Sequence, residues 1–144
     1  MLVFQKPIES KFLGGLEDAM NAEICLGTVS SIKDAIRWLT YTYFNIRLMR
    51  NPLCYGFKHD ELATAELRNS AMDRIIREAA KKLHRTRMIR FSEASTSMSI
   101  TSLGRIASHY YIKAESIAVY TKAIHEAMTD EEILDMFSNS SEFE

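Results

Sequence analysis

Cysteine is scarce in this sequence, and that scarcity excludes two classes of small protein. Cys25 and Cys54 are the only cysteines among the 144 residues, too few for a disulfide-stapled secreted scaffold or a four-cysteine zinc site. The four histidines are dispersed, and none has a histidine or cysteine three or four residues away that could share a metal on one helix face. We therefore expect no metal site and a reducing intracellular location, in the nucleus, the cytoplasm or both.

Glycine is also scarce, and long apolar runs are absent from the sequence. None of the five glycines precedes a lysine, so the sequence lacks the loop in which backbone amides and an ammonium group cradle a nucleotide phosphate. No uninterrupted apolar run approaches the ~20 residues that cross a bilayer, and the first residues lack the apolar core of a secretion signal. We expect a soluble chain with no membrane partner and no cofactor of its own.

Residues that could do acid–base or nucleophilic chemistry are isolated from one another. His59, Asp60 and Glu61 form the nearest thing to a catalytic cluster, but they lie in a polar stretch that offers no burial to tune them. Cys25 lies at the end of an apolar helical pattern, where a buried and inert thiol is the usual case. The sequence therefore predicts no catalytic residue and no enzyme activity in this segment.

The sequence does have enough apolar residues for a core, and its charge is unevenly distributed. Hydrophobic residues make up 47% of the chain, which excludes disorder for most of it. Lysine and arginine total 18 against 19 acidic residues, yet seven basic residues stand against two acidic ones between 73 and 90. From residue 126 onward there are seven acidic residues and no lysine or arginine. Such blocks are either solvated helix faces or surfaces that meet a polyanion or a protein partner.

The apolar spacing predicts helices from the start of the chain. From Ile8 to Leu26 apolar residues recur at three- and four-residue steps, and the glycine pair at 14–15 predicts two short helices or one kinked helix. Gly27 is expected to end this segment. Ser31, with Asp34 three residues later, is an N-cap signature and predicts that a new helix begins there.

We predict that this new helix is long and continuous, running from Ile32 to about Arg50 and stopped by Pro52. Its expected buried stripe consists of Ile32, Ala35, Ile36, Leu39, Tyr43 and Ile46. Trp38, the only tryptophan, lies beside that stripe and is expected to be an ordinary core aromatic.

A second strong helix is predicted after a connection over residues 51–68, with Ser70 as its cap. One face is apolar and is expected to be buried, through Met72, Ile75, Ile76, Ala79 and Leu83. The opposite face is cationic and carries Arg74, Arg77, Lys81 and Arg85. The helix is thus expected to pack by one face and to present positive charge on the other.

Beyond Arg87 the periodicity becomes that of a β-hairpin, with arms at 88–91 and 98–101 joined by a polar stretch. Helix, brief strand, helix, helix and hairpin is the order of elements in a winged-helix domain, where the hairpin is the wing. The predicted fold class is therefore mainly α with a small β-hairpin.

Three more helices are predicted after the hairpin, from Leu103 to about Lys113, from Ser116 to Met128 and from Thr129 to Phe137. Thr129 and Glu132 form a capping box for the last of them. These helices have apolar faces and no sheet to cover them, so we expect them to begin a helical bundle that continues past Glu144.

Several runs, taken together, resemble one family. They are Lys6–Ser10, Leu16–Ile24, Leu26–Val29, Asp34–Ala35, Trp38–Leu39, Tyr41–Tyr43, Arg47, Asn51–Leu53, Tyr55–Gly56 and Ser102–Ile112. They are similar to the segment that follows the second RecA-like domain in the large Ski-like superfamily-two RNA helicases with tandem cassettes. Within that family, the runs at 51–56 and 81–91 are more similar to the activating-signal-cointegrator-complex branch than to the spliceosomal branch.

The resemblance implies an organisation and a set of partners. Residues 1–8 would be a linker from a preceding motor domain, 9–101 a winged-helix domain packed on the motor core, and 102–144 the start of a Sec-type helical domain. ATP and magnesium would serve the parent motor only. The partners would be the RecA-like motor domains and helical ratchet domain of the same chain, an RNA or DNA strand, and protein subunits of a larger complex.

One departure from the family concerns the wing. The hairpin turn of family members commonly contains glycine, whereas residues 93–96 contain none. The wing tip therefore needs another turn type or a longer loop.

The candidate contact residues lie mainly on the basic helix: Arg74, Arg77, Lys81, Lys82 and Arg85, with Arg105 further along. DNA-reading winged-helix domains insert this helix into the major groove, but a face that offers almost only charge supports non-specific phosphate contact instead. The resemblance implies a third use, an internal interface that braces the motor domains, and we favour it. The alternative is a freestanding winged-helix regulator that binds nucleic acid.

Gly104 and Arg105 form a separate feature. Glycine in the first turn of a helix is typical of a close backbone approach. Arginine near a helix N-terminus lies at the unfavourable end of the helix dipole, which predicts a carboxylate or anion partner in this domain or in the motor.

Overall fold

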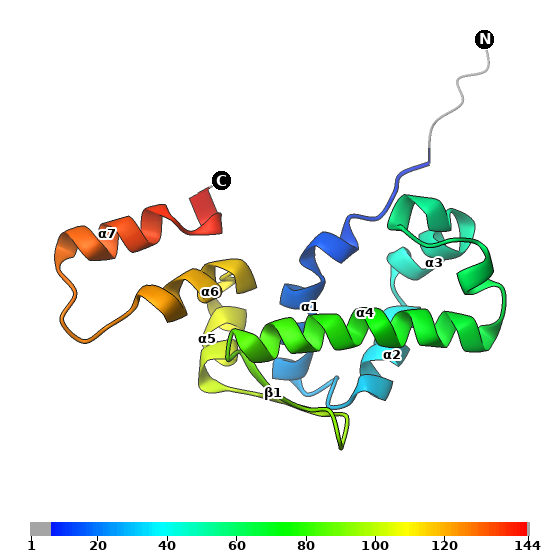
Figure 1. Cartoon of the computed structure of the whole chain (residues 1–144), viewed down its shortest axis with the longest axis horizontal. Helices are drawn as coiled ribbons and strands as arrows, with labels where there is room; N and C mark the ends of the chain where they lie inside the picture. The colour runs from blue at the N-terminus through cyan, green and yellow to red at the C-terminus, as the bar shows by residue number, and fades with distance from the viewer. Residues whose placement is uncertain (1–6, 144) are drawn as a thin grey trace, which may run out of the picture.

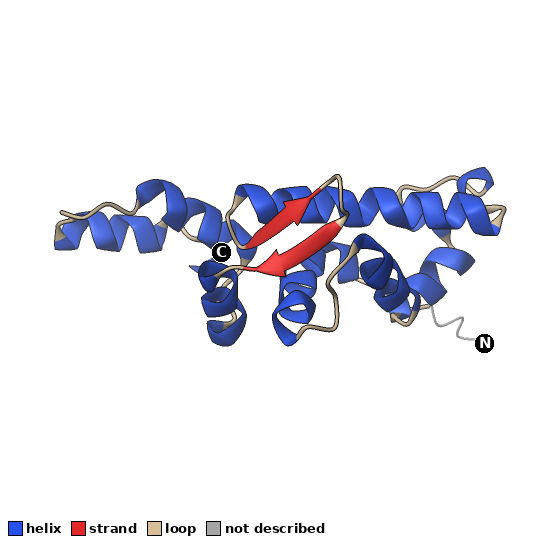
Figure 2. Cartoon of the chain, turned by 90° about the horizontal axis from the view of Figure 1, so that it is seen from below, coloured by secondary structure: helices blue, strands red, loops and turns tan. Residues whose placement is uncertain are grey.

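The computed structural model describes residues 7–143, so residues 1–6 of the predicted linker and Glu144 lie outside the described residues. The helices and strands in chain order are α1 Leu16–Leu26, α2 Ile32–Thr40, α3 Tyr43–Arg50, α4 Ala65–Arg85, β1 Ile89–Ser92, β2 Ser97–Ile100, α5 Ser102–Tyr110, α6 Ala114–Ala123 and α7 Asp130–Ser138. Short 3₁₀ helices lie at Phe12–Gly15, Pro52–Tyr55, Asp60–Leu62 and Ser141–Phe143. The predicted fold class, mainly α with one small hairpin, is confirmed (Figures 1 and 2).

The first helical segment is interrupted at the glycine pair, as predicted. A 3₁₀ turn ends at Gly15 and α1 begins at Leu16. Gly27 follows α1 with φ of 81°, a left-handed conformation that glycine adopts without strain, and its amide closes the helix end. Ile8 was expected on the apolar stripe, but it precedes both helices and is 80% exposed.

The predicted helix from Ile32 to Arg50 is wrong, because the chain breaks at Tyr41–Thr42 into α2 and α3. The Thr42 hydroxyl donates to the Leu39 carbonyl at 2.7 Å and accepts from the Asn45 amide at 3.4 Å, so it ends one helix and caps the next. The break changes the helical phase. Phe44 and Leu48 are buried in α3 in place of the predicted Tyr43 and Ile46, which are both half exposed.

The start of α2 and the position of Trp38 follow the sequence prediction. The Ser31 hydroxyl accepts from the Asp34 amide at 3.2 Å, which confirms the predicted N-cap. Trp38 packs partly buried against the core, with its ring 5.5 Å from that of Phe12.

Helix α4 is the long central helix of the molecule and packs on α1, α2 and β1 (Figure 1). Its predicted cap at Ser70 is wrong. The Thr64 hydroxyl accepts from the Leu67 amide at 3.2 Å, so the helix begins at Ala65. The predicted apolar face is confirmed, since Met72, Ile76, Ala79 and Leu83 are buried and Ile75 is partly buried.

The wing is an antiparallel pair in which Ile89 faces Ile100 and Ser92 faces Ser97 (Figure 2). A single bridge from Ser31 to Ser97 adds the short strand that precedes α2 in a winged-helix domain. The turn at 93–96 contains no glycine. Thr96 instead adopts the left-handed conformation, at φ 54°.

The C-terminal helices differ in how they join the core. Ala107 of α5, with Ala114 and Ile117 of α6, belongs to the same buried cluster as α1 and α4. Helix α7 packs on α6, where the Tyr120 and Phe137 rings are 5.7 Å apart, and it extends away from the central helix (Figure 1). The capping box of Thr129 and Glu132 is confirmed.

Two of the C-terminal helices end earlier than predicted. The helix expected from Leu103 to about Lys113 ends at Tyr110. The helix expected over Ser116–Met128 ends at Ala123, and Ile124 has extended backbone with ψ 127°. Within residues 7–143 no helix is long and apolar enough to cross a membrane.

Candidate functional site

Most of the predicted cationic strip on α4 is engaged by carboxylates of this same chain. Arg77 pairs with Asp73 at 2.6 Å, and Arg74 lies 3.5 Å from Glu61 and over the ring of Phe57. The two lysines reach other elements. Lys81 pairs with Glu93 at the wing tip at 2.9 Å, and Lys82 pairs with Glu17 of α1 at 3.0 Å and lies 3.7 Å from Glu115 of α6.

Two of these pairs shift the pKa of one member. The ammonium group of Lys81 lowers the pKa of the Glu93 carboxyl, and the hydrogen bond with Glu17 raises the pKa of Lys82. All of these side chains are partly open to solvent, so each pair contributes little to stability. Their effect is to neutralise the strip. A helix whose cations already have carboxylate partners attracts a polyanion less than its sequence predicts.

Two of the six predicted contact residues differ from the others. Arg85 and Arg105 are exposed, and neither has a carboxylate partner among residues 7–143. The predicted partner of Arg105 in the motor domains stays a prediction. Its neighbour Gly104 shows the predicted close approach, because a Cβ there would lie 2.0 Å from the Met88 carbonyl oxygen.

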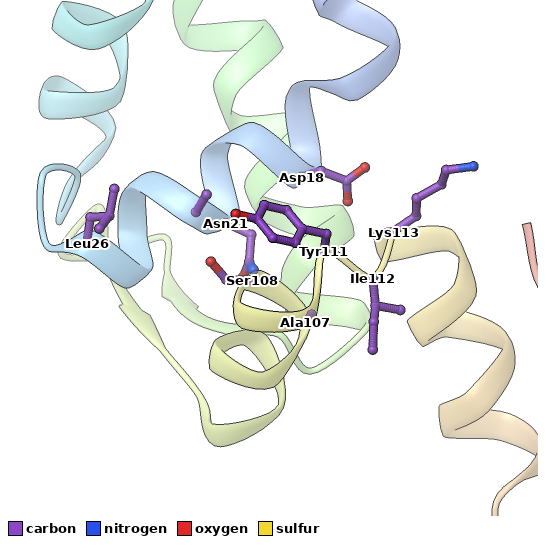
Figure 3. Close-up of a pocket in the computed structure, with 9 residues that line it drawn as sticks. Asp18, Asn21, Leu26, Ala107, Ser108, Tyr111, Ile112 and Lys113 are labelled. Carbon is purple, nitrogen blue, oxygen red and sulfur yellow. The ribbon is translucent and has the colours of Figure 1, made fainter. Parts of the chain in front are cut away.

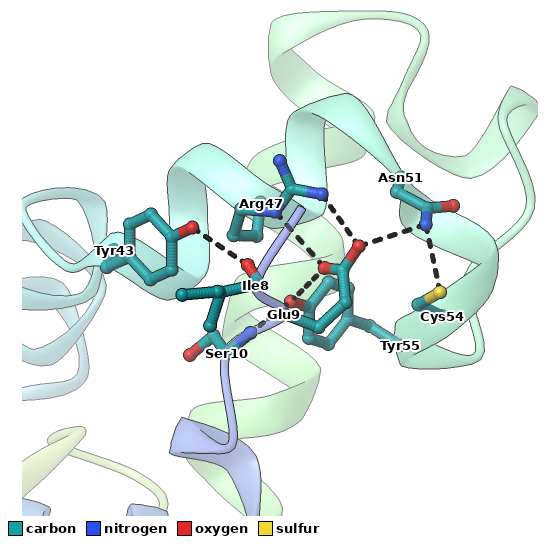
Figure 4. Close-up of polar contacts among 8 residues, drawn as sticks. All are labelled: Ile8, Glu9, Ser10, Tyr43, Arg47, Asn51, Cys54 and Tyr55. Carbon is teal, nitrogen blue, oxygen red and sulfur yellow. Dashed lines mark hydrogen bonds and ion pairs between the residues drawn. The ribbon is translucent and has the colours of Figure 1, made fainter. Parts of the chain in front are cut away.

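The structure shows a second polar cluster that the sequence did not reveal as a site (Figure 4). Glu9 receives two hydrogen bonds from Arg47 of α3, at 2.6 and 3.1 Å, one from the Tyr55 hydroxyl at 2.8 Å and one from Asn51 at 3.2 Å. The guanidinium of Arg47 lowers the pKa of Glu9 to about 2. These partners lie 38 to 46 residues from Glu9, so no local pattern could have paired them.

This Glu9 cluster fixes the path of the N-terminal segment. The Tyr43 hydroxyl donates to the Ile8 carbonyl at 2.8 Å, and the Ser10 amide donates to the Tyr55 hydroxyl at 2.8 Å. Figure 4 shows residues 8–10 crossing α3 and the turn that follows it. Residues 8–10 are therefore held beside α3, and we call these contacts the tether.

Next to the tether lies an apolar surface without a partner among the described residues. Tyr43, Ile46, Met49 and Leu53 recur at three- and four-residue steps along α3 and the following turn, and together with Ile8 they are 41–80% exposed. We call these five residues the α3 face. Large apolar side chains gathered on one helix face are typical of a surface that another domain covers.

A third feature joins α1 to α5 and α6. The Asp18 carboxylate accepts from the Ala114 amide at 2.7 Å, and Glu142 accepts from the Lys113 amide at 2.8 Å, so two acidic side chains cap α6. Burial raises the pKa of the Asp18 carboxyl. Asn21 donates to the Gly104 carbonyl at 2.9 Å and links α1 to α5.

Beside these contacts is a cavity of about 340 Å³ between α1 and α5 (Figure 3). Tyr111 lies over it in a left-handed conformation at φ 56°, and the Asn21 Oδ1 atom is buried without a partner. Its two charged lining groups are occupied, Asp18 by Ala114 and Lys113 by the Ser141 carbonyl at 2.7 Å. Among residues 7–143, no group of three histidine, cysteine, aspartate or glutamate side chains is placed to hold a metal.

Two family descriptions match this sequence. A Winged Helix-turn-helix domain matches residues 9–92, and a Sec63 Brl domain matches residues 100–144. The gap between the two matches, residues 93–99, covers the turn and most of the second strand of the wing.

Full-length relatives match nearly the whole chain. Activating signal cointegrator 1 complex subunit 3 of Dictyostelium discoideum is 47% identical over 138 residues, which is 96% of this chain and 6% of the relative. The DExH-box ATP-dependent RNA helicase DExH14 of Arabidopsis thaliana is 41% identical over 100% of this chain and 7% of the relative. The U5 small nuclear ribonucleoprotein 200 kDa helicase of Drosophila melanogaster is 41% identical over 96% of this chain and 6% of the relative.

Proposed function

We propose, from the premise that this chain belongs to the winged-helix and Sec63 region of the Ski-like DExH RNA helicase family, that it is a non-catalytic accessory part of such a helicase. It braces the motor domains and helps to form the nucleic-acid channel during unwinding. The family predicted from the sequence is confirmed by the matches. The chain spans 6–7% of the length of the three relatives described, so the activity of a whole protein is part of the proposal.

The observation that carries the bracing role is the α3 face beside the tether. Glu9 and Arg47 hold the N-terminal segment against α3, so the domain that precedes this segment in the parent is held at high effective concentration next to that face. Five large apolar side chains are exposed there. Burying them against the motor would stabilise the contact at roughly 25 cal/mol per Å² of apolar area.

The remaining parts of the proposal follow from the family. The parent would bind ATP and magnesium in its motor domains, with RecA-like domains and a helical ratchet domain as partners of this region in the same chain. An RNA strand, protein subunits of a larger complex, and a nuclear or cytoplasmic location are proposed for the parent.

A freestanding regulator is the second candidate, because α4 occupies the position of the recognition helix and one of its faces is cationic. Four of its five candidate cations are paired with carboxylates. The bracing role is therefore better supported than readout of a major groove.

The bracing role is tested by Ile46→Asp in both the parent helicase and this chain alone. In this chain Ile46 is half exposed, so its unfolding temperature should hardly change. In the parent, a charge buried in the interface should lower both the unfolding temperature and the unwinding rate. Ile106→Asp, the same substitution at a 49% exposed isoleucine on α5, is the matched control and should leave both unchanged. Equal behaviour of the two variants in the parent would overturn the bracing role.

A further inference from the structure

The cavity between α1 and α5 collects hydrogen-bond acceptors that the described part of this chain leaves unsatisfied (Figure 3). Asn21 is 2% exposed, and its Oδ1 atom has no donor among residues 7–143, although its amide nitrogen donates to the Gly104 carbonyl. Only the Oδ1 atom of Asp18 accepts a hydrogen bond, from the Ala114 amide, and the Ser108 hydroxyl has no partner among the described residues. Because an unsatisfied buried acceptor costs free energy, these groups favour a ligand that donates hydrogen bonds.

The charges around this cavity favour a cation. Burial raises the pKa of the Asp18 carboxyl, and three neighbouring carboxylates raise it further, those of Glu17, Glu115 and Glu142. Two lysines lie nearby, but Lys82 is engaged by Glu17 at 3.0 Å and the ammonium group of Lys113 by a backbone carbonyl at 2.7 Å. Figure 3 shows the Lys113 side chain directed away from the Tyr111 ring. Four carboxylates therefore stand against two lysines here, and a positively charged donor is attracted.

Tyr111 lies over the cavity in a conformation that itself costs free energy. Its φ is 56°, in the left-handed region that residues other than glycine seldom adopt, and the residue is 91% exposed. So exposed a ring makes little packing within this chain that could offset the strain. Backbone strain of this kind is typical of ligand sites. Because the face of an aromatic ring attracts a cation, Tyr111 is placed to cover one that enters beside Asp18.

A guanidinium group combines the properties that these residues require. It carries a permanent positive charge, five N–H donors in one plane, and flat faces that stack on an aromatic ring. The acceptors come from two helices, with Asp18 and Asn21 on α1 and Ser108 on α5, so a forked donor can meet more of them at once than an ammonium group can. A cavity of about 340 Å³ is at the small end of ligand sites and suits a single side chain.

We propose that the cavity between α1 and α5 binds the guanidinium group of an arginine side chain from another protein segment. The guanidinium donates to Asp18 Oδ2 and Asn21 Oδ1, and the Tyr111 ring covers its face. The residues that line the cavity belong to α1, α5 and the turn after α5, and none of them is part of the α3 face. The inference therefore does not depend on the bracing role.

The test is an NMR titration of the isotope-labelled chain with the blocked peptide acetyl-Gly-Arg-Gly-amide. Saturable shifts are expected for the side-chain amide of Asn21 and for the backbone amides of Ala22 and Ser108. The same peptide with citrulline, which has the shape of arginine without its charge, should bind about tenfold more weakly, because hydrogen bonds between charged groups are stronger. Methylguanidine lacks the aliphatic stem that would pack on Ile112, so it should also bind more weakly than the arginine peptide.

Two variants remove the proposed contacts and keep the fold. Asp18→Asn retains an acceptor for the Ala114 amide and should weaken binding of the arginine peptide about tenfold. Tyr111→Gly relieves the left-handed strain, so it should be nearly as stable as the unaltered chain while binding falls about fivefold. The matched controls are Glu23→Gln, which removes the same charge from α1 outside the cavity, and Thr96→Gly, which relieves the same strain in the wing. Both controls should bind the arginine peptide normally.

Several results would overturn the inference. They are the lack of a saturable shift with the arginine peptide, shifts centred outside the cavity, equal weakening by the control variants, and equal binding of the citrulline peptide. Methylguanidine binding as tight as that of the arginine peptide would assign the cavity to a small free guanidine and exclude a protein side chain. Ile46→Asp should bind the arginine peptide normally, which keeps this test separate from that of the bracing role.

Discussion

At the scale of single residues, the Glu9 cluster makes the N-terminal tether depend on pH. Arg47 is 6% exposed, so replacing Glu9 with Gln leaves a nearly buried cation without its carboxylate partner. We expect the unfolding temperature of Glu9→Gln to fall by several degrees at neutral pH. Glu126→Gln, which removes an exposed carboxylate far from the tether, is the comparison.

The same cluster predicts the direction of the pH dependence. The pKa of Glu9 is about 2 in the fold against 4.5 for an ordinary glutamate. Its contribution to stability is therefore complete above pH 4.5 and is lost as the pH falls toward 2. Chemical denaturation across that range should show a slope that is smaller in Glu9→Gln, because other carboxyls with lowered pKa values, such as Glu93, remain. A slope that is equal in both proteins would exclude the ion pair as its source.

Gly104 gives a second prediction for a single residue. A methyl group there would meet the Met88 carbonyl oxygen at 2.0 Å, so Gly104→Ala must displace the wing from α5. We expect a loss of about 3 kcal/mol in the free energy of unfolding, at the upper end for overpacking. Gly14→Ala has nothing within 4 Å of the added carbon and should change stability by less than ~1 kcal/mol. Urea denaturation of both variants measures these free energies of unfolding. Similar losses in the two variants would contradict the close approach of Gly104 to the Met88 carbonyl.

At the scale of elements, Asp18 controls how α6 docks on α1. Burial raises the pKa of its carboxyl, so the ionised form weakens the fold as the pH rises through that pKa. Asp18→Asn keeps an oxygen for the Ala114 amide and removes the buried charge, so it should be at least as stable at pH 7 as the unaltered chain. Asp18→Leu removes the acceptor and should lose about 1 kcal/mol. Thermal unfolding of the three proteins measures this, and a less stable Asp18→Asn would show that the charge itself holds α6.

The elements also show what the sequence could predict. The caps at Ser31 and Thr129 and the break at the glycine pair depend on residues within four positions of one another, and all three were predicted. The break at Thr42 was missed because its hydroxyl competes with the helix for the Leu39 carbonyl, and the same residue type is also tolerated inside helices. That one error put Tyr43 and Ile46 in the core.

The candidate site was harder to predict than the fold for a similar reason. The basic helix was visible in the sequence, but its neutralisation depends on Glu93 in the wing and Glu17 in α1, which only tertiary structure brings to Lys81 and Lys82. The Glu9 cluster joins residues 38 and more positions apart. Pairings of this kind leave no periodic signal in one sequence.

At the scale of the whole molecule, the apolar and the acidic surfaces lie on different parts of the chain. The tether and the α3 face lie near one end of α4, and the acidic α7 lies beyond its other end (Figure 1). This arrangement leads us to propose that the α3 face is covered in the parent helicase.

Hydrogen exchange, measured on the isolated chain and on the same residues within the parent helicase, shows whether the α3 face is covered. We expect slower exchange in the parent for the amides of residues 8–10 and of α3, because a packed motor domain would suppress local opening there. The amides of α2, whose contacts lie within this chain, should exchange at similar rates in both. Unchanged exchange in α3 and residues 8–10 would contradict the bracing role.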